Sequence, residues 1–409
     1  MRPTELYTQI LGIEYPWRVT AVDLDRDEGE LHVFVELDEG VELACPTCGR
    51  SAGRYDHRER RWRHLDTCQY KTILVARVPR AKCSDCGVHQ VDVPWAEAGS
   101  RFTALFEALV IDWLRDANTA AVARQLRLSW DSVDGIMSRA VDRGLRRRTS
   151  ETVTRIGVDE TSFQKRHEYV TVVSDLDRDR VLHVADKNRE SSLDEFYQTL
   201  TPEQLSQIEV VCMDMWRAFI ASTRRHVPEA EEKIAFDKFH VAQMLGHAVD
   251  RVRRAERKKL RGTGDDVLKG TRYYWLQNPD NMDEQRWNQF ASLRESTLKT
   301  ARAWAIKELA MSLWNYARRG WAKRAWKRWL GWALRSRLEP IRAAAKSIRK
   351  YLWGILNAIV LEATNAKAEG MNSKIQMIKR RACGFRNRER FKNAIYFHLG
   401  GLDLYPRGI

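Results

Sequence analysis

The sequence contains no hydrophobic run long enough to cross a lipid bilayer. Its longest apolar stretch, YLWGILNAIV at residues 351–360, is much shorter than the roughly 20 residues that a transmembrane helix needs. The first residues, MRPTELYTQILGIEYPW, also lack the apolar core of a secretion signal. We therefore expect a soluble, intracellular protein with no membrane partner.

Cysteine is scarce, which argues against a disulfide-stabilised fold. Seven cysteines occur in 409 residues, too few and too scattered for such a scaffold. Four of them form two CxxC pairs, each followed by glycine: Cys45 with Cys48, and Cys83 with Cys86. Two such pairs typically hold one structural zinc ion through four thiolates, although two unrelated cysteine pairs would look the same. Lower-ranked candidate ligands are His57, His64 and Cys68.

Motifs of nucleotide-dependent enzymes are also missing. GTGDDVLKG at residues 262–270 matches neither the dinucleotide fingerprint nor the P-loop, so no nucleotide cofactor is expected. No arrangement of Ser, His and Asp or of Cys and His suggests a nucleophilic enzyme. His240, in FDKFHV, follows a predicted strand and could assist a catalytic site, but a lone histidine is more often structural.

Acidic residues are outnumbered, and this excess of positive charge points to a polyanionic partner. The chain has 70 Lys and Arg against 55 Asp and Glu, a formal net charge of +15, which is typical of nucleic-acid binding. Residues 301–350 alone hold 14 basic and two acidic side chains, and Arg324 and Arg328 are our candidate DNA contacts there. The tryptophans of this segment are expected mainly in the core, and one or two of them are candidates to stack on an unpaired base.

Periodicity divides the chain into four regions. Residues 1–98 show strand-like alternation and residues 99–150 are helical. A series of short strands follows from Arg155 onward, and residues 241–374 are almost entirely helical. The strands after Arg155 alternate with helices, which predicts a mixed α/β sheet.

The helical region resembles a DNA-reading element. A helix over residues 119–126, a short turn and a second helix capped by Ser129 predict a helix-turn-helix, although a plain three-helix bundle would show the same stripe. The second helix would enter the major groove, with Ser132, Arg139 and Arg143 facing outward. Between the cysteine pairs, HRERRWRHLD is either a phosphate-contacting ribbon, through Arg61 and Arg63, or a solvated hairpin.

Three distant acids form the candidate catalytic site. Asp159 and Asp214 follow the predicted strands RIGV and VVCM, where α/β sheets present their chemistry. Glu369 stands among basic residues, on the polar face of a predicted helix that also carries Asn372, a further candidate. Three carboxylates can hold two divalent cations for displacement at phosphorus, and hard oxygen ligands favour Mg²⁺ or Mn²⁺. The neighbouring DNA contacts would be Lys374, Lys379 and Arg380.

These motifs, in this order, resemble those of the transposases of ISL3-family insertion sequences. They include CPTCG, VPRAKCSDCGV, GVDETSF, MDMWRAF, FDKFHV and AEGMNSKIQMIKRRACGFRN. The resemblance implies a DDE transposase whose catalytic acids are Asp159, Asp214 and Glu369, in a prokaryotic cytoplasm near the nucleoid. It also implies binding of terminal inverted repeats, metal-dependent hydrolysis and strand transfer on double-stranded DNA, carried out by a homodimer or a higher assembly.

The expected architecture is multidomain, with an RNase H-like α/β catalytic domain interrupted by a mostly helical insertion. The expected boundaries are a zinc ribbon at 1–98, a helix-turn-helix at 99–150, the first catalytic part at 151–258, the basic Trp-rich insertion at 259–355 and the closing part at 356–409. Two alternatives stay open: a non-catalytic DNA-binding regulator, and a nuclease of the same fold that cuts without joining.

Overall fold

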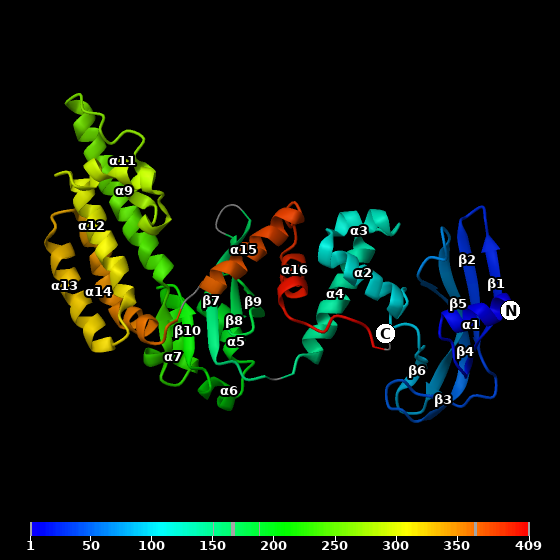
Figure 1. The fold of residues 1–409 in the computed structure, drawn as a ribbon. Helices are drawn as coiled ribbons and strands as arrows, with labels where there is room; N and C mark the ends of the chain where they lie inside the picture. Colours follow the sequence, from blue (N-terminus) through cyan, green and yellow to red (C-terminus); the bar gives the residue numbers. More distant parts are fainter. Residues whose placement is uncertain (1, 150, 165–167, 188, 364–365, 408–409) are drawn as a thin grey trace. The chain divides into compact units, whose positions relative to one another are not determined.

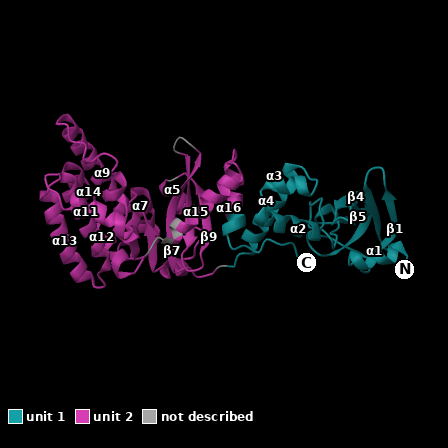
Figure 2. Cartoon of the chain, turned by 45° about the horizontal axis from the view of Figure 1, so that its top comes forward, with its two compact units in different colours: residues 1–149, 396–409 teal, residues 150–395 magenta. Residues whose placement is uncertain are grey.

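The chain forms two compact units, which Figure 2 distinguishes by colour. The first comprises residues 1–149 and 396–409, and the second comprises residues 150–395. The computed structural model describes residues 2–149, 151–164, 168–187, 189–363 and 366–407, without the side chains of residues 366, 368 and 369. We expected the last 14 residues to belong with the catalytic domain, but they pack in the first unit.

The N-terminal part of the first unit is a six-stranded sheet with one short helix, α1 (Pro3–Ile10). Its strands are β1 (Trp17–Asp25), β2 (Glu30–Leu37), β3 (Leu43–Ala44), β4 (Ser51–Arg63), β5 (Lys71–Cys83) and β6 (Gly87–Gln90). They follow the order β1-β2-β5-β4-β3, with β6 paired to β5. Val33, Leu74 and Val78 alternate inward and are buried in the core of this sheet, as the strand period predicts.

Three helices follow: α2 (Ala104–Asp116), α3 (Thr119–Gln125) and α4 (Trp130–Arg147). The predicted cap of α4 is present, because the Ser129 side chain accepts a hydrogen bond from the Ser132 backbone N–H at 3.1 Å. Val133, Ile136 and Ala140 bury one face of α4. The helix-turn-helix predicted from the sequence is therefore confirmed.

The second unit is built on a five-stranded sheet of order β11-β10-β7-β8-β9 (Figure 1). Its strands are β7 (Arg155–Gln164), β8 (Glu168–Asp175), β9 (Arg180–Asp186), β10 (Val210–Met213) and β11 (Ile234–Phe236). The first three are antiparallel, whereas β10 runs parallel to both β7 and β11. This mixed sheet agrees with the RNase H-like arrangement that we expected.

Helices surround this sheet and continue into the insertion. Between the strands lie α5 (Glu190–Tyr197), α6 (Pro202–Ser206), α7 (Arg217–His226) and α8 (Ala230–Lys233). The insertion contains α9 (Lys238–Gly262), α10 (Arg272–Leu276), the 3-10 turn η1 (Pro279–Asn281), α11 (Glu284–Arg294), α12 (Lys299–Ser312), the 3-10 turn η2 (Leu313–Asn315), α13 (Arg319–Arg335) and α14 (Glu339–Val360). Two helices close the chain, α15 (Ala366–Arg381) and α16 (Arg388–Leu399).

The insertion and the sheet share one hydrophobic core. Val211 and Phe236 of the sheet belong to the same buried cluster as Trp275, Trp326 and Trp329 of the insertion. The Trp329 indole N–H donates to the Ile306 carbonyl at 2.8 Å, so burying its polar atom is not costly. Most tryptophans of the basic segment therefore serve packing, as the sequence predicted.

Among the described residues, none of the helices has the length and apolar character needed to cross a membrane.

Candidate catalytic site

Three aspartates form a row across adjacent strands of the second unit. In the parallel pairing of β7 with β10, Gly157 lies opposite Cys212, and continuing this register by two residues brings Asp159 opposite Asp214. In the pairing of β10 with β11, Met213 lies opposite Phe236, so the next residues are Asp214 and Asp237. Neighbouring strands lie about 4.8 Å apart, and partners two residues on point to the same face.

One prediction about this row is wrong. Asp159 does not end its strand, because β7 continues to Gln164 as one arm of a hairpin with β8. The pairing of β7 with β10 ends earlier, because Gly157 is the last residue of β7 that pairs with β10. Asp214 does follow directly after its strand, as predicted. The parallel pairing with β10 therefore ends before Asp159, whose backbone still pairs with Val172 of β8.

The electrostatics of these acids fit a site for cations. The pKa of Asp159 is raised to about 6, mainly by burial and to a smaller extent by the charges of Asp214 and Asp237, while the Glu160 backbone N–H and His240 lower it. Burial also raises the pKa of Asp214, against the opposing effect of His240. Carboxylates that destabilise one another in this way are held together at lower cost by a bound cation.

Helix α15 lies along β7 and contributes amides to this site (Figure 1). The Asn372 side chain donates to Asp159 Oδ2 at 2.7 Å, and the Gln376 side chain donates to Thr161 Oγ1 at 2.7 Å. Met371 and Ile375 are buried on the apolar face of this helix. The polar face predicted for this helix contacts β7 through the two amides.

The side chain of Glu369 lies outside the described residues. Its backbone belongs to α15, three residues before Asn372 and seven before Gln376, so helical periodicity puts all three positions on one face. Since Asn372 and Gln376 contact two alternate residues of β7, Asp159 and Thr161, position 369 is the next on this face toward the N-terminus of the helix.

Asp237 and Gln376 were not singled out by the sequence. Asp237 caps α9, where its Oδ1 accepts the Phe239 N–H at 3.0 Å, and its Oδ2 lies 4.0 Å from His240 Nε2. The criterion that found Asp214 would also have found Asp237, because both follow a short parallel strand directly. Contacts of Gln376 and Lys379 with β7 depend on tertiary packing and have no local signal.

The four cysteines of the two CxxC pairs meet in the first unit. Their Sγ atoms all lie within 4.8 Å of one another, and Cys48 Sγ is 3.7 Å from Cys83 Sγ. A tetrahedron with zinc–sulfur bonds of about 2.3 Å has edges of about 3.8 Å. Backbone N–H groups of Cys48 and Thr47 lower the pKa of Cys45 to about 6, which favours a thiolate ligand. Gly49 and Gly87 take the positive φ angles of +71° and +85° that the turns require.

Among the described side chains, the acids do not form a group as tight as the thiols. The cysteine quartet alone keeps three or more ligand atoms within 4.8 Å of one another. The zinc-type site is thus preformed by local turns, whereas the acidic site combines residues that are far apart in the chain.

Arg63 does not face solvent, which corrects our prediction that it contacts DNA. It donates to the His64 carbonyl at 2.8 Å, forms an ion pair with Asp66 and lies over the Phe106 ring at 5.0 Å. The last residues of β4 turn into the core, where Trp62 is also buried. Arg61, by contrast, is exposed.

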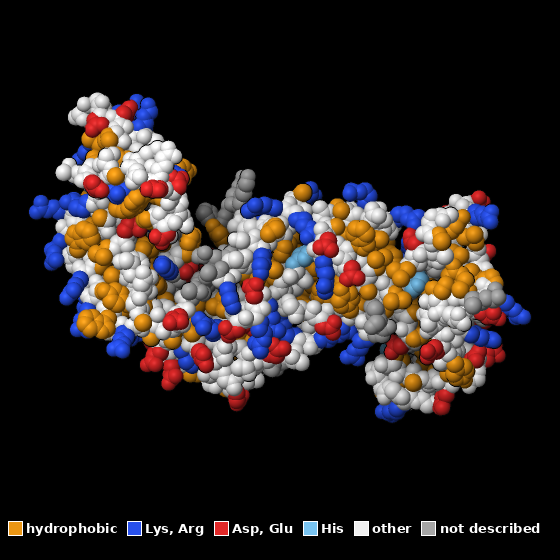
Figure 3. Space-filling view, viewed as in Figure 1, with side chains coloured by type: hydrophobic (Ala, Val, Ile, Leu, Met, Phe, Trp, Pro, Cys, Tyr) orange, Lys and Arg blue, Asp and Glu red, His pale blue; other side chains and the backbone are white. Residues whose placement is uncertain are grey.

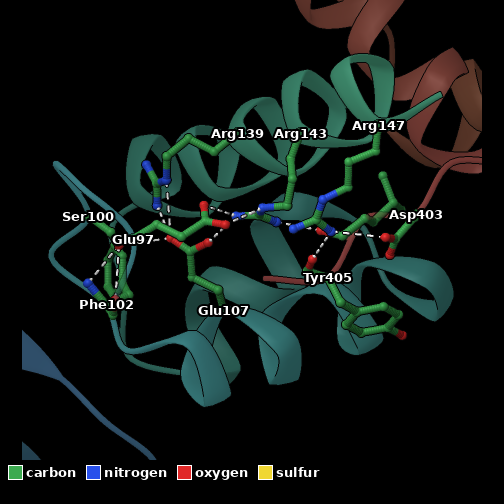
Figure 4. Close-up of polar contacts among 10 residues, drawn as sticks. Glu97, Ser100, Phe102, Glu107, Arg139, Arg143, Arg147, Asp403 and Tyr405 are labelled. Carbon is green, nitrogen blue, oxygen red and sulfur yellow. Dashed lines mark hydrogen bonds and ion pairs between the residues drawn. The ribbon is translucent and has the colours of Figure 1, made fainter. Parts of the chain in front are cut away.

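Arg143 of α4 also points inward, so the prediction that it faces the major groove is wrong, whereas Arg139 is 34% exposed although it binds Glu107 (Figure 4). The Arg143 side chain is only 3% exposed and contacts Glu107 at 3.0 Å. Arg139 donates to the same Glu107 carboxylate at 2.5 Å. Arg143 lies seven residues after Ile136 and three after Ala140, on the buried stripe of the helix. Ser132 stays half-exposed, with its hydroxyl 2.8 Å from that of Ser129.

The C-terminal segment completes this polar cluster. Arg143 donates to the Leu404 carbonyl, Arg147 donates to the Tyr405 carbonyl at 2.5 Å, and the Tyr405 hydroxyl donates to Asp112 at 2.5 Å. We call residues 400–407 the C-terminal tail. Its contacts explain why the arginines of α4 turn away from solvent: they hold backbone from the far end of the chain.

The basic candidates of the second unit differ in their surroundings. Lys379 donates to the Ser162 carbonyl at 2.9 Å, and Lys374 forms an ion pair of 2.7 Å with Asp179. Arg380 is exposed, as are Arg324 and Arg328. Lys and Arg side chains project from the helical part of this unit in the space-filling view, at the left of Figure 3.

The chain matches three family models in the order of its regions. A transposase model of the DDE type, for the ISL3 group, matches residues 156–395. A model described as the helix-turn-helix domain of transposase family ISL3 matches residues 91–141. A third, the zinc-finger of transposase IS204/IS1001/IS1096/IS1165, matches residues 42–86.

Curated relatives agree over nearly the whole length. The transposase for insertion sequence element IS1001 of Bordetella parapertussis is 29% identical over 389 residues, which cover 93% of this chain and 95% of the relative. The transposase for insertion sequence element IS1557 of Mycobacterium tuberculosis is 29% identical over 420 aligned positions, covering 95% and 93%. With its zinc-type cysteine cluster, its helix-turn-helix and its row of acids in matching order, the chain belongs to the ISL3 family of DDE transposases.

Proposed function

We propose that the protein cuts DNA at the ends of an insertion sequence and joins the freed strand to a target. The observation that carries this proposal is the register of Asp159, Asp214 and Asp237 across β7, β10 and β11, with Asn372 of α15 bonded to Asp159. Asp159, Asp214 and Glu369 would hold two Mg²⁺ or Mn²⁺ ions. When bound, the ions would activate water and neutralise charge at phosphorus.

The residues of the chain prepare this site in three ways. Backbone N–H groups of Glu160 and Trp216 donate to Asp159 Oδ1 at 2.7 Å and to Asp214 Oδ1 at 3.0 Å, which fixes the direction of each carboxylate. Asn372 occupies the other oxygen of Asp159. His240, whose charge lowers the pKa of both acids, is proposed to limit their mutual repulsion until the cations bind.

DNA is proposed to contact both units. In the first unit, Arg61 and Ser132 remain candidates because both are accessible, and the four cysteines would hold one structural zinc. In the second unit, the candidate DNA contacts are Lys374, Lys379 and Arg380, which follow Glu369 on α15. We further propose that two copies or more pair the terminal repeats, and that the protein acts at the nucleoid.

The outer face of α13 offers a longer DNA contact. Trp321, Arg324, Arg328, Trp332 and Arg335 are exposed and recur every three or four residues, so they form one stripe along the helix. Arg324 stacks on the Trp321 ring at 4.0 Å. Since α13 contains no acid, the stripe suits a phosphate backbone and leaves two rings, 55% and 38% exposed, for bases or sugars.

A cleavage and joining assay in Mg²⁺ tests the central proposal. Wild type should cut and join a duplex that ends in the terminal repeat, and Asp214→Asn and Glu369→Gln should each lose activity on the order of 100-fold or more. Equal activity of wild type and Asp214→Asn would remove the acidic site from the reaction. Cutting without joined products would identify a nuclease instead, and binding without cutting would identify a regulator.

Salt dependence tests the stripe on α13. Replacing Arg324 and Arg328 together by Ala should reduce the slope of log affinity against log salt by about 0.9 for each lost phosphate contact. Lys346→Ala is the matched control, since it removes an exposed cation from the neighbouring helix α14. An unchanged slope in the double variant would refute this contact.

A further inference from the structure

The helical insertion contains a groove that begins beside the row of acids. It lies among α9, α10 and α12 and has a volume of about 700 Å³. Sites for drug-sized ligands commonly occupy about 300–1,000 Å³. The groove is therefore large enough for a group of nucleotide size.

One end of the groove adjoins the acidic site. Lys238 and Phe239, which line it, directly follow Asp237 and precede His240. The Phe239 N–H donates to Asp237 at 3.0 Å, and its ring centroid lies 6.0 Å from that of His240. A group bound at this end of the groove would therefore lie next to the carboxylates of the acidic site.

The lining combines a flat apolar surface with hydrogen-bonding groups. The Phe239 side chain is 50% exposed, and Met311 lines the groove with it. The amides of Gln243 and Asn315 are exposed and can each donate and accept hydrogen bonds. Exposed Lys238 adds a cation at the end nearest the acids. Arg272 and Lys307 also line the groove, as do the carboxylates of Asp280 and Glu308, and Lys307 pairs with Glu308 at 2.5 Å. An aromatic face, amides and the cation of Lys238 match a nucleobase and its phosphate.

Gly246 keeps the groove open. It lies in the middle of α9, where glycine is less favourable than alanine. A Cβ at this position would meet only Leu276 Cδ2, at 3.9 Å, so close packing does not require glycine here. Since Gly246 lines the groove, a large side chain at this position would occupy the space in which a ligand could lie.

We propose that this groove receives one unpaired base of the DNA, next to the phosphodiester bond that is cut. This inference rests on the proposed function, since it presupposes DNA at the acidic site. Flipping a base out of the duplex loses pairing and stacking, and contact with Phe239 restores part of the lost stacking. The groove would thereby select DNA ends that open easily at the cut position.

Cleavage by variants of the groove provides the first test. Gly246→Phe should fill the groove and reduce cutting of a fully paired end, while the control Ala255→Phe, which places the same side chain at an exposed position of α9 outside the groove, should cut at the wild-type rate. Phe239→Ala should cut about 5- to 150-fold more slowly, which is the factor expected from the stacking of one base. A mismatch at the cut position should restore part of that loss, because unpairing then costs less.

Permanganate, which oxidises unpaired thymines, provides the second test. Full-length Asp214→Asn bound to an end with thymines around the cut position should show one reactive thymine. The reactivity should persist with Ala255→Phe and disappear with Gly246→Phe. Full cutting by Gly246→Phe, or a reactive thymine unaffected by it, would overturn the groove, as would a loss of DNA affinity without any unpaired base. If the wild-type protein cuts no DNA in this assay, the result refutes the proposed function and not the groove alone.

Discussion

Two glycines of the same helix should respond in opposite ways to replacement by alanine. Both Gly135 and Gly144 lie in α4, and in a helix Ala is more stable than Gly by about 0.5–1 kcal/mol. A Cβ at Gly135 would meet only Arg139 Nη1, at 3.6 Å. A Cβ at Gly144 would lie 2.6 Å from Leu402 Cβ and 3.2 Å from the Asp403 carbonyl oxygen, so it collides with the C-terminal tail.

The collision should outweigh the gain in helix stability. Forcing extra atoms into close packing costs about 1–3 kcal/mol, so Gly144→Ala should destabilise the docked tail by up to about 2 kcal/mol. Gly135→Ala should stabilise the helix by about 0.5–1 kcal/mol. The loss arises at the tail because the atoms that approach Gly144 belong to a Cβ and a backbone oxygen, which cannot rotate away as the end of a long side chain can.

Hydrogen exchange of the full chain measures both effects. Amides of residues 400–407 should exchange faster in Gly144→Ala than in wild type, and those of α4 should exchange more slowly in Gly135→Ala. Limited proteolysis should release the tail only in Gly144→Ala. Equal protection of the tail in the two variants would refute the packing that we describe between α4 and the end of the chain.

Three further predictions concern the first unit. Glu107→Ala should lower the free energy of unfolding by about 3–5 kcal/mol, because it leaves the buried guanidinium of Arg143 without its buried partner. The control Glu97→Ala should cost far less, since Glu97 is half-exposed. If both variants lost the same exchange protection in α2 and α4, this reasoning would be contradicted. Burial lowers the pKa of His64 from 6.5 to about 4, so the unfolded state binds more protons between these values and stability should fall as pH drops through that range. By pH 5 the loss should be about 2 kcal/mol, and His64→Gln, measured by exchange of β4 and β5, should remove this part of the pH dependence. Cys83→Ser should lose bound zinc in metal analysis while Cys68→Ser, outside the cluster, keeps it; unchanged zinc in both would exclude the four-thiolate site.

The features that the sequence predicted best are those whose signal is local. The zinc-type cysteines lie in two short turns, and the cap of α4 lies three residues from its acceptor. The five strands of the second unit follow from short runs of apolar residues between turns, and β10 and β11 are buried at every position. Asp214 was found because a short buried strand ends just before it, and the same rule would have found Asp237.

The predictions that failed depended on partners far away in the chain. Arg143 looked like an exposed base on an amphipathic helix, but its partners Glu97 and Leu404 are 46 and 261 residues away. Arg63 is buried because it packs over the Phe106 ring and forms an ion pair with Asp66. For Asp159, the strand was predicted to stop where the hydrophobic residues stop, whereas the hairpin with β8 extends it. Composition reports charge, but tertiary contacts decide which charges remain available.

The return of the C-terminal tail to α4 has a consequence for how copies of such an element decay. A stop codon that removed only the last ten residues would leave every proposed metal ligand encoded and the catalytic sheet whole. The change would instead destabilise the helix-turn-helix, against which the C-terminal tail packs. Such a copy would look intact by its acidic residues and yet fail to recognise its own ends.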